Sequence, residues 1–98
     1  MYEVAVFVAA GCPFCDAAID ATRRLPSVPD RTVRIVDVHE RPGLRERLAR
    51  QTGCPTLPSV WVGNTYIGGL NTGPPAFGGL ANVIAKDLWH AARLHDRM

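Results

Sequence analysis

The sequence has 98 residues, which is enough for one small domain with a modest hydrophobic core. Its composition of 47% hydrophobic and 20% charged residues excludes a disordered chain. The formal net charge of +2 arises from basic residues that alternate with acidic ones, so no one-signed surface for nucleic acid is expected. We therefore treat residues 1–98 as a single domain.

The longest apolar stretch, Val4–Ala10, is too short to span a bilayer, and Met1-Tyr2-Glu3 lacks the positive segment of a signal peptide. Three cysteines argue against a disulfide-stapled secreted domain, which normally carries an even and larger number. We expect a cytoplasmic monomer that binds neither membranes nor nucleic acid.

The first half of the chain predicts a strand–helix–strand unit. Val4–Val8 is a continuous apolar run, typical of a central strand that is buried on both faces. Apolar positions three and four apart predict a helix over Pro13–Leu25, which Pro26 and Pro29 end. Val33–Val38 predicts a second strand, parallel to the first through a right-handed crossover.

The second half predicts a short helix over Leu44–Gln51 and a hairpin of Ser59–Val62 with Thr65–Ile67. A loop rich in proline and glycine, Gly73–Gly79, precedes one final helix from Leu80 to Leu94. The resulting order resembles that of a minimal thioredoxin-like domain, an α/β fold with a four-stranded mixed sheet flanked by helices on both faces.

Two cysteines three residues apart lie where the first strand ends and the first helix begins. Cys12 is expected near unpaired backbone N–H groups and the positive end of the helix dipole, which favour the thiolate. Pro13 suits the first helical position, and Phe14 is expected to cover one side of the pair. Cys15 faces Cys12 across the first turn, so Cys12 is predicted to attack disulfides and Cys15 to resolve the mixed disulfide.

Two alternatives for this pair are a zinc site and two buried cysteines without a function. Zinc needs about four ligands, and Cys12 and Cys15 supply two. The other possible zinc ligands are Cys54, His39, His90 and His95. Their spacing is not that of a second zinc half-site, so we predict no metal.

Several further motifs surround the dithiol in the sequence. A proline directly before an apolar strand, as at Pro58, is unusual because proline cannot donate to a sheet ladder. The sequence from Val4 to Gly69 resembles that of a glutaredoxin. The matching features are Cys12-Pro13-Phe14-Cys15, Thr52-Gly53 followed by Thr56-Leu57-Pro58, the hairpin with Gly63-Asn64, and Gly68-Gly69.

The resemblance implies a thiol–disulfide oxidoreductase with no tightly bound cofactor, glutathione as co-substrate and disulfide-containing proteins as partners. It also implies a cis Pro58 beside the dithiol and a Leu57 backbone that pairs with a bound cysteinyl peptide. The catalytic residues are predicted to be Cys12 and Cys15. The predicted substrate contacts are Pro13, Phe14, Arg45, Thr56, Leu57, Pro58, Gly69, Asn71 and Thr72. For Arg45, surface solvation is an equal alternative to contact with the glycine carboxylate of glutathione.

Two departures from the family pattern leave the electron donor open. Glutaredoxins typically carry Lys or Arg at the position of Ala9, and an acidic or serine-containing segment after the Gly-Gly pair. The alternatives are a donor that depends on thioredoxin reductase, a non-enzymatic iron–sulfur carrier, and an adaptor with a vestigial motif. Pro13 argues against the carrier, because cluster-binding members more often have glycine in the motif.

Two features have no assigned role from the sequence. Cys54 is expected near the active-site surface, as a small partly buried thiol rather than as a glutathionylated residue or half of a second disulfide. The Gly73–Gly79 loop with Phe77 is either a partner-recognition element or a connection.

Overall fold

A computed structural model of the chain describes residues 2–96. Its elements in chain order are β1 (Tyr2–Val8), α1 (Pro13–Arg23), β2 (Arg31–Asp37), the 3-10 helix η1 (Val38–Glu40), α2 (Leu44–Thr52), β3 (Ser59–Val62), β4 (Thr65–Gly68), α3 (Leu80–Lys86) and α4 (Trp89–Asp96). The strands form one sheet in the order β2-β1-β3-β4. β1 is parallel to β2 and antiparallel to β3, which is antiparallel to β4, so the predicted mixed sheet is confirmed.

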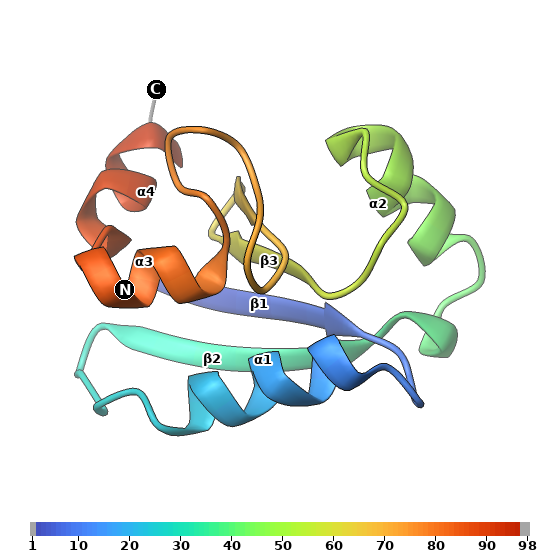
Figure 1. The fold of residues 1–98 in the computed structure, drawn as a ribbon, viewed down its shortest axis with the longest axis horizontal. Helices are drawn as coiled ribbons and strands as arrows, with labels where there is room; N and C mark the ends of the chain where they lie inside the picture. Colours follow the sequence, from blue (N-terminus) through green and yellow to red (C-terminus); the bar gives the residue numbers. More distant parts are fainter. Residues whose placement is uncertain (1, 97–98) are drawn as a thin grey trace.

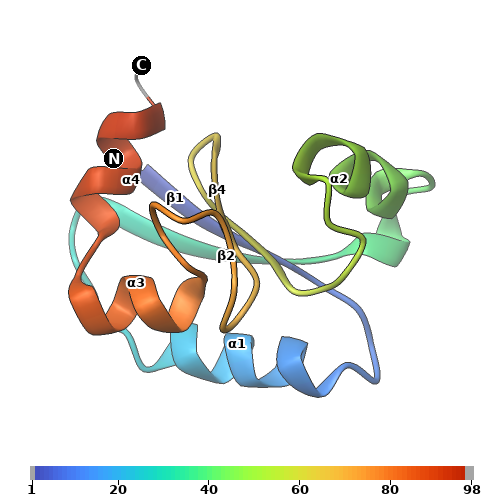
Figure 2. The same cartoon turned by 45° about the horizontal axis from the view of Figure 1, so that its top comes forward.

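Helices cover both faces of the sheet. Figures 1 and 2 show α1 and α3 on one face and α2 on the other, toward the end of the sheet where β1 leads into α1. α4 packs beside the far end of the sheet, against β3 and β4. The face toward α1 and α3 carries the main core, and α2 leaves part of the opposite face open.

Alternating residues of the two central strands form the main core. Val4 and Val6 of β1 are fully buried, and the register pairs them with the equally buried Val62 and Val60 of β3. Side chains alternate across a strand, so these four valines share one face. They meet Ala18 of α1 and two residues of α3, Leu80 and Val83.

The opposite face of the same strands is less completely covered. Ala5 of β1 pairs with Trp61 of β3, and Leu48 of α2 is buried close by. The indole N–H of Trp61 donates a hydrogen bond to the hydroxyl of Ser59 over 3.0 Å. β1 is thus nearly buried on both faces, as its continuous apolar run predicted.

The prediction of one continuous final helix is wrong. α3 ends at Lys86, and α4 starts three residues later at Trp89. Asp87 between them has a φ of 53°, a left-handed conformation that aspartate tolerates better than most residues. The N–H of Leu88 then bonds to the carbonyl of Val83 over 3.0 Å, which closes the end of α3. Because no glycine or proline marks this point, the apolar stripe alone suggested one helix.

Other boundaries differ by a few residues from the prediction. α1 ends at Arg23 and not at Leu25, and Val38 lies in η1 after the end of β2. No helix in the described part of the chain is long and apolar enough to cross a membrane.

Candidate active site

Cys12 is the N-cap residue of α1, and its sulfur takes part in the cap. The backbone N–H of Cys15 donates a hydrogen bond to the Cys12 sulfur, with 3.2 Å between nitrogen and sulfur. This N–H is one of the groups at a helix start that have no partner within the helix. A donor directed at the sulfur, together with the helix dipole, favours negative charge on Cys12.

Cys15 occupies the inner side of the first turn. Its side chain is fully buried in the main core, whereas Cys12 is partly exposed. Burial first, and then a hydrogen bond with Cys12, raise the pKa of the Cys15 thiol to about 11. The pair is therefore asymmetric: Cys15 keeps its proton, and Cys12 presents the accessible sulfur.

The segment before β3 approaches the dithiol from the other side. The peptide bond between Leu57 and Pro58 is cis, as the resemblance implied. The Cys12 S–H donates a hydrogen bond to the Leu57 carbonyl oxygen, with 3.8 Å between sulfur and oxygen. The backbone at the cis Leu57–Pro58 bond is therefore held next to the candidate nucleophile.

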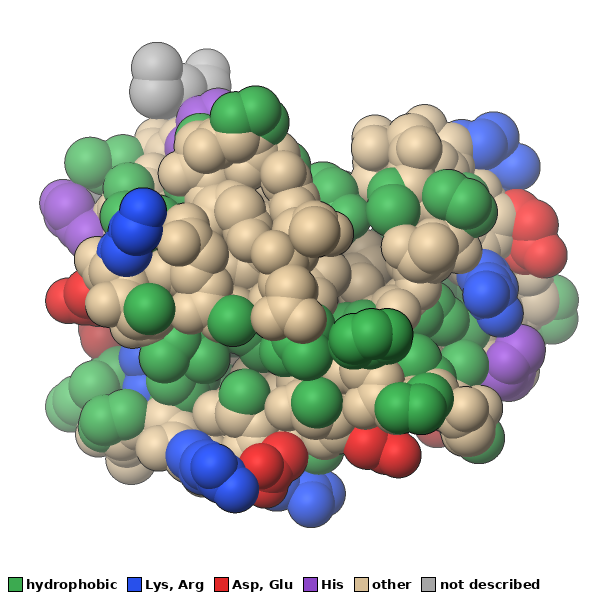
Figure 3. Space-filling model, viewed as in Figure 1, with side chains coloured by type: hydrophobic (Ala, Val, Ile, Leu, Met, Phe, Trp, Pro, Cys, Tyr) green, Lys and Arg blue, Asp and Glu red, His purple; other side chains and the backbone are tan. Residues whose placement is uncertain are grey.

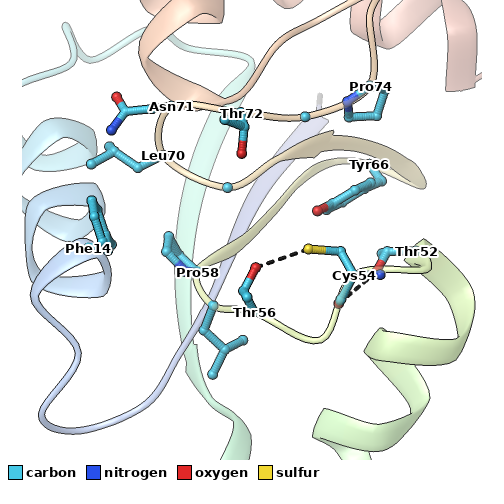
Figure 4. A pocket seen from close by; sticks show the side chains of 13 residues that line it. Phe14, Thr52, Cys54, Thr56, Pro58, Tyr66, Leu70, Asn71, Thr72 and Pro74 are labelled. Atoms are coloured by element: carbon cyan, nitrogen blue, oxygen red, sulfur yellow. Dashed lines mark hydrogen bonds between the residues drawn. The ribbon is translucent and has the colours of Figure 1, made fainter.

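A pocket of about 720 Å³ opens between these elements. The pocket is lined by Phe14, Thr52, Cys54, Thr56, Leu57, Pro58, Tyr66, Gly69, Leu70, Asn71, Thr72, Gly73 and Pro74. Figure 3 shows the molecule hollowed between the loop after β4 and α2, and Figure 4 shows the lining side chains from close by. Phe14 and Pro58 stand at one end, near the start of α1, and Tyr66 and Pro74 at the other.

The structure brings most of the predicted substrate contacts together. Those that line the pocket are Phe14, Thr56, Leu57, Pro58, Gly69, Asn71 and Thr72. Pro13 and Arg45 are not among the described residues that line it. Arg45 is exposed in the first turn of α2, whereas the pocket uses Thr52 at the opposite end of that helix. Its exposed position corresponds to surface solvation, the alternative to contact with the glycine carboxylate of glutathione.

Cys54 and Tyr66 are the main additions to the predicted site. The sulfur of Cys54 lies 3.0 Å from the hydroxyl oxygen of Thr56, and Figure 4 shows it between the hydroxyls of Thr56 and Tyr66, directed into the pocket. Hydrogen bonds from Thr56, and a weaker one from Tyr66, lower the pKa of Cys54. Burial first, and then the neighbouring Cys54, raise the pKa of Tyr66 to about 12.

The loop that follows β4 is held by close backbone contacts. A Cβ on Gly68 would lie 2.3 Å from the Thr72 oxygen, and one on Gly73 would lie 2.3 Å from the Ile67 oxygen. The N–H of Gly69 also bonds to the Thr72 carbonyl over 2.8 Å. Residues 69–73 therefore lie against the end of β4 as a fixed wall of the pocket.

The loop hypothesis for partner recognition needs one correction. Phe77 is buried in the main core and makes an edge contact with His95, with 5.7 Å between ring centroids. Phe77 therefore anchors the loop and is not available to a partner. Pro74 of the same loop does line the pocket.

Among the residues that the structure describes, no group of three or more His, Cys, Asp or Glu could hold a metal ion. The dithiol pair therefore lies without additional thiolate or imidazole groups at ligand distance within residues 2–96.

Similarity to known proteins decides the family. The sequence model of the family described as Glutaredoxin matches residues 4–67, well over half of the chain. The chain belongs to the glutaredoxin family. A glutaredoxin of Pseudomonas aeruginosa is 34% identical over 74 residues, which are 70% of this chain and 77% of that protein. Glutaredoxin-1 of Gallus gallus is 29% identical over 69 residues, 70% of this chain and 67% of that protein.

The fold agrees with this family. The crystal structure of the holo form of glutaredoxin C1 from Populus tremula x tremuloides matches with a TM-score of 0.60 and 23% identity. The match covers 97% of this chain and 85% of that one, and it shows the thioredoxin-like fold. Family, fold and the Cys12–Cys15 pair identify the protein as a thiol–disulfide oxidoreductase.

Proposed function

We propose that the protein reduces disulfides through Cys12 as nucleophile and Cys15 as resolving thiol, with glutathione or another thiol as electron donor. The observation that carries the proposal is the asymmetry of the pair. The Cys12 sulfur is partly exposed and receives the Cys15 N–H, whereas the Cys15 side chain is buried and keeps its proton. We therefore assign the attack on the substrate to the Cys12 sulfur, and the later attack on the mixed disulfide to the buried Cys15 sulfur.

The proposed reaction has two exchange steps. In the first, the Cys12 thiolate attacks a substrate disulfide R–S–S–R′, a bond forms between Cys12 and one substrate sulfur, and the other leaves as a thiolate that takes up a proton. In the second, Cys15 attacks the Cys12 sulfur to form the Cys12–Cys15 disulfide, and the proton that it gives up is taken by the leaving R–S⁻, which departs as R–SH. Two molecules of donor thiol then reduce this disulfide and become oxidised to their own disulfide.

The pocket supplies the place for the substrate in this proposal. The Leu57 backbone lies beside Cys12 and is suited to pair with an extended cysteinyl segment. Asn71 and Thr72 on the opposite wall can donate and accept further hydrogen bonds. We propose disulfide-containing proteins and low-molecular-weight disulfides as substrates, and the cytoplasm, where donor thiols are kept reduced, as the location.

The test uses a Cys15→Ser variant that is mixed with glutathione disulfide and weighed by mass spectrometry. The expected result is a single stable adduct on Cys12, because the resolving thiol is missing. Peptide mapping separates this adduct from one on Cys54, and Cys12→Ser is the matched control. Absence of any adduct on Cys12, with glutathione disulfide and with a small neutral disulfide alike, would overturn the proposal.

The wild-type protein distinguishes the donors. Turnover by reduced glutathione supports glutathione as donor, and turnover only by a thioredoxin reductase supports the other donor class. A brown colour with visible absorbance after anaerobic purification would instead support the iron–sulfur carrier.

A further inference from the structure

The wall of the pocket is made of uncharged groups. The 13 residues that line it in the described part of the chain include no Asp, Glu, Lys, Arg or His. They present apolar surface from side chains such as Phe14 and Leu70, together with hydroxyl, thiol and amide groups. In Figure 3 the side chains in the hollow are hydrophobic or belong to the uncharged class, and no blue or red side chain is seen in it.

Much of the hydrogen-bonding capacity of this wall is used within the protein. The Thr52 hydroxyl donates to the Leu48 carbonyl and accepts from the N–H of Cys54, and the Thr56 hydroxyl is paired with the Cys54 sulfur. Thr72, on the other side, points its hydroxyl into the pocket. A ligand group in the pocket therefore meets neutral partners.

The charge nearest to the dithiol along the chain is negative. Asp16 follows Cys15 directly in the first turn of α1, and its carboxylate contributes to the raised pKa of Cys15. In the described part of the chain, no cationic side chain lines the pocket to pair with an anionic thiol that approaches Cys12. Within the pocket its own carboxylates would lose water without gaining an ion pair, which is costly.

We propose that the pocket selects thiols and disulfides whose cysteine carries no charged groups next to it, and that it disfavours anionic thiols such as glutathione. This inference rests on the proposed function, because it assumes that Cys12 exchanges with the bound disulfide. The reaction is Cys12–S⁻ with R–S–S–R, which gives Cys12–S–S–R and R–S⁻. Small neutral thiols and uncharged protein segments share the required chemistry.

The test compares two probes that differ only in charge. The disulfide of N-acetylcysteine carries two carboxylates, and the disulfide of N-acetylcysteine amide is neutral. Both are reacted with Cys15→Ser protein, and the rate of adduct formation on Cys12 is followed by mass spectrometry. The same two disulfides are reacted with 2-mercaptoethanol, a neutral reference thiol that corrects for their intrinsic reactivities.

The expected result is a preference for the neutral disulfide of about tenfold beyond that of the reference thiol. A protein that prefers the neutral probe no more than the reference thiol does would overturn the inference and leave the proposed function intact. Failure of both probes to modify Cys12 would overturn the proposed function itself. The two failures are therefore distinguishable.

A pocket variant locates the origin of the preference. Thr72→Lys places a positive charge where the hydroxyl points into the pocket, and Thr72→Gln is a matched uncharged control. The preference for the neutral probe is expected to shrink several-fold in Thr72→Lys relative to Thr72→Gln. An equal preference in the two variants would show that it does not arise in the pocket, and would overturn the inference.

The same assay separates the two sources of an uncharged cysteine. The disulfide of an acetylated and amidated Gly-Cys-Gly peptide is compared with that of N-acetylcysteine amide. A faster reaction of the peptide identifies a protein segment as the substrate. An equal or slower reaction of the peptide identifies small neutral thiols as the substrate class. Either assignment applies only if the protein prefers the neutral probe over the charged one in the first comparison.

Discussion

The Cys12 sulfur lies 3.8 Å from the backbone oxygen of Leu57, although 45 positions separate the two residues in the sequence. The sheet creates this proximity. β1 and β3 are antiparallel neighbours in which Phe7 pairs with Ser59, so the last residues of β1 and the first residues of β3 lie at the same end of the sheet. Cys12 therefore follows the end of β1, and the Leu57 backbone directly precedes β3 at the same place.

We predict that Cys15 titrates near pH 11 in the reduced protein, against the ordinary value of 9.0. Burial and the hydrogen bond to Cys12 both disfavour its thiolate. The folded protein thus holds a proton in this interval that the unfolded chain loses, so stability falls as the pH rises from 9.0 toward 11. The chemical shift of the Cys15 Cβ measures the midpoint, and Cys15→Ser is expected to lack the corresponding loss of stability. A midpoint at the ordinary value would contradict this.

We predict that Thr56→Val slows alkylation of Cys54 at neutral pH, because the variant keeps the shape of the side chain and removes the main donor to the thiolate. Without this donor the pKa of Cys54 returns toward its ordinary value, so the thiolate fraction and the labelling rate at neutral pH both fall. Tyr66→Phe removes the weaker donor and should have a smaller effect. Iodoacetamide labelling of a Cys12→Ser/Cys15→Ser protein gives the rates. Equal rates in all three proteins would show that these hydroxyls do not activate Cys54.

We predict that Gly73→Ala destabilises the protein more than Gly53→Ala does. A Cβ at Gly73 would lie 2.3 Å from the Ile67 oxygen and 2.7 Å from the Gly68 Cα, so the backbone must shift at a cost of about 1–3 kcal/mol or more. Gly53 has a φ of +71° and open space around it, so alanine there costs only about 1 kcal/mol of backbone strain. Urea unfolding of both variants measures the difference, and the reverse order would refute the close approach.

We predict a stability loss of about 1–2 kcal/mol for Thr65→Val, which removes a buried hydrogen bond. The Thr65 hydroxyl donates to the carbonyl of Ala92 over 3.1 Å and ties β4 to α4. Thr32 on β2 is exposed, so Thr32→Val is the matched control and should change stability by no more than about 0.5 kcal/mol. Thermal unfolding of the pair decides: similar melting temperatures would mean that the Thr65 bond contributes nothing.

Local sequence patterns were sufficient for the sheet and for the dithiol. The run Val4–Val8 and the pair Gly63-Asn64 mark a buried strand and a tight hairpin, because both signals are contained within a few residues. The spacing of Cys12 and Cys15 likewise fixes their meeting across one helical turn. These features depend on neighbours in the sequence and little on the rest of the fold.

The missed features depend on contacts between distant segments. Tyr66 meets Cys54 only because β4 and the segment before β3 fold against each other, and nothing near either residue in the sequence indicates this. Asp87 interrupts the final helix by adopting a left-handed conformation that its residue type permits but does not require. For Arg45, ligand contact and surface solvation are equal expectations from the sequence, and the residue lies in the first turn of α2, at the other end of the helix from Thr52 of the pocket.

The glycines at 68 and 73 have a consequence for how this protein can diversify. They fix the path of the backbone around residues 70–72, where the exposed side chains of Asn71 and Thr72 line the pocket and Leu70 also packs against the core. Substitutions at 71 and 72 can therefore alter the chemistry offered to a ligand while the architecture stays the same. For protein engineering, these two positions are the natural place for a library that changes substrate preference, provided that the two glycines are left untouched.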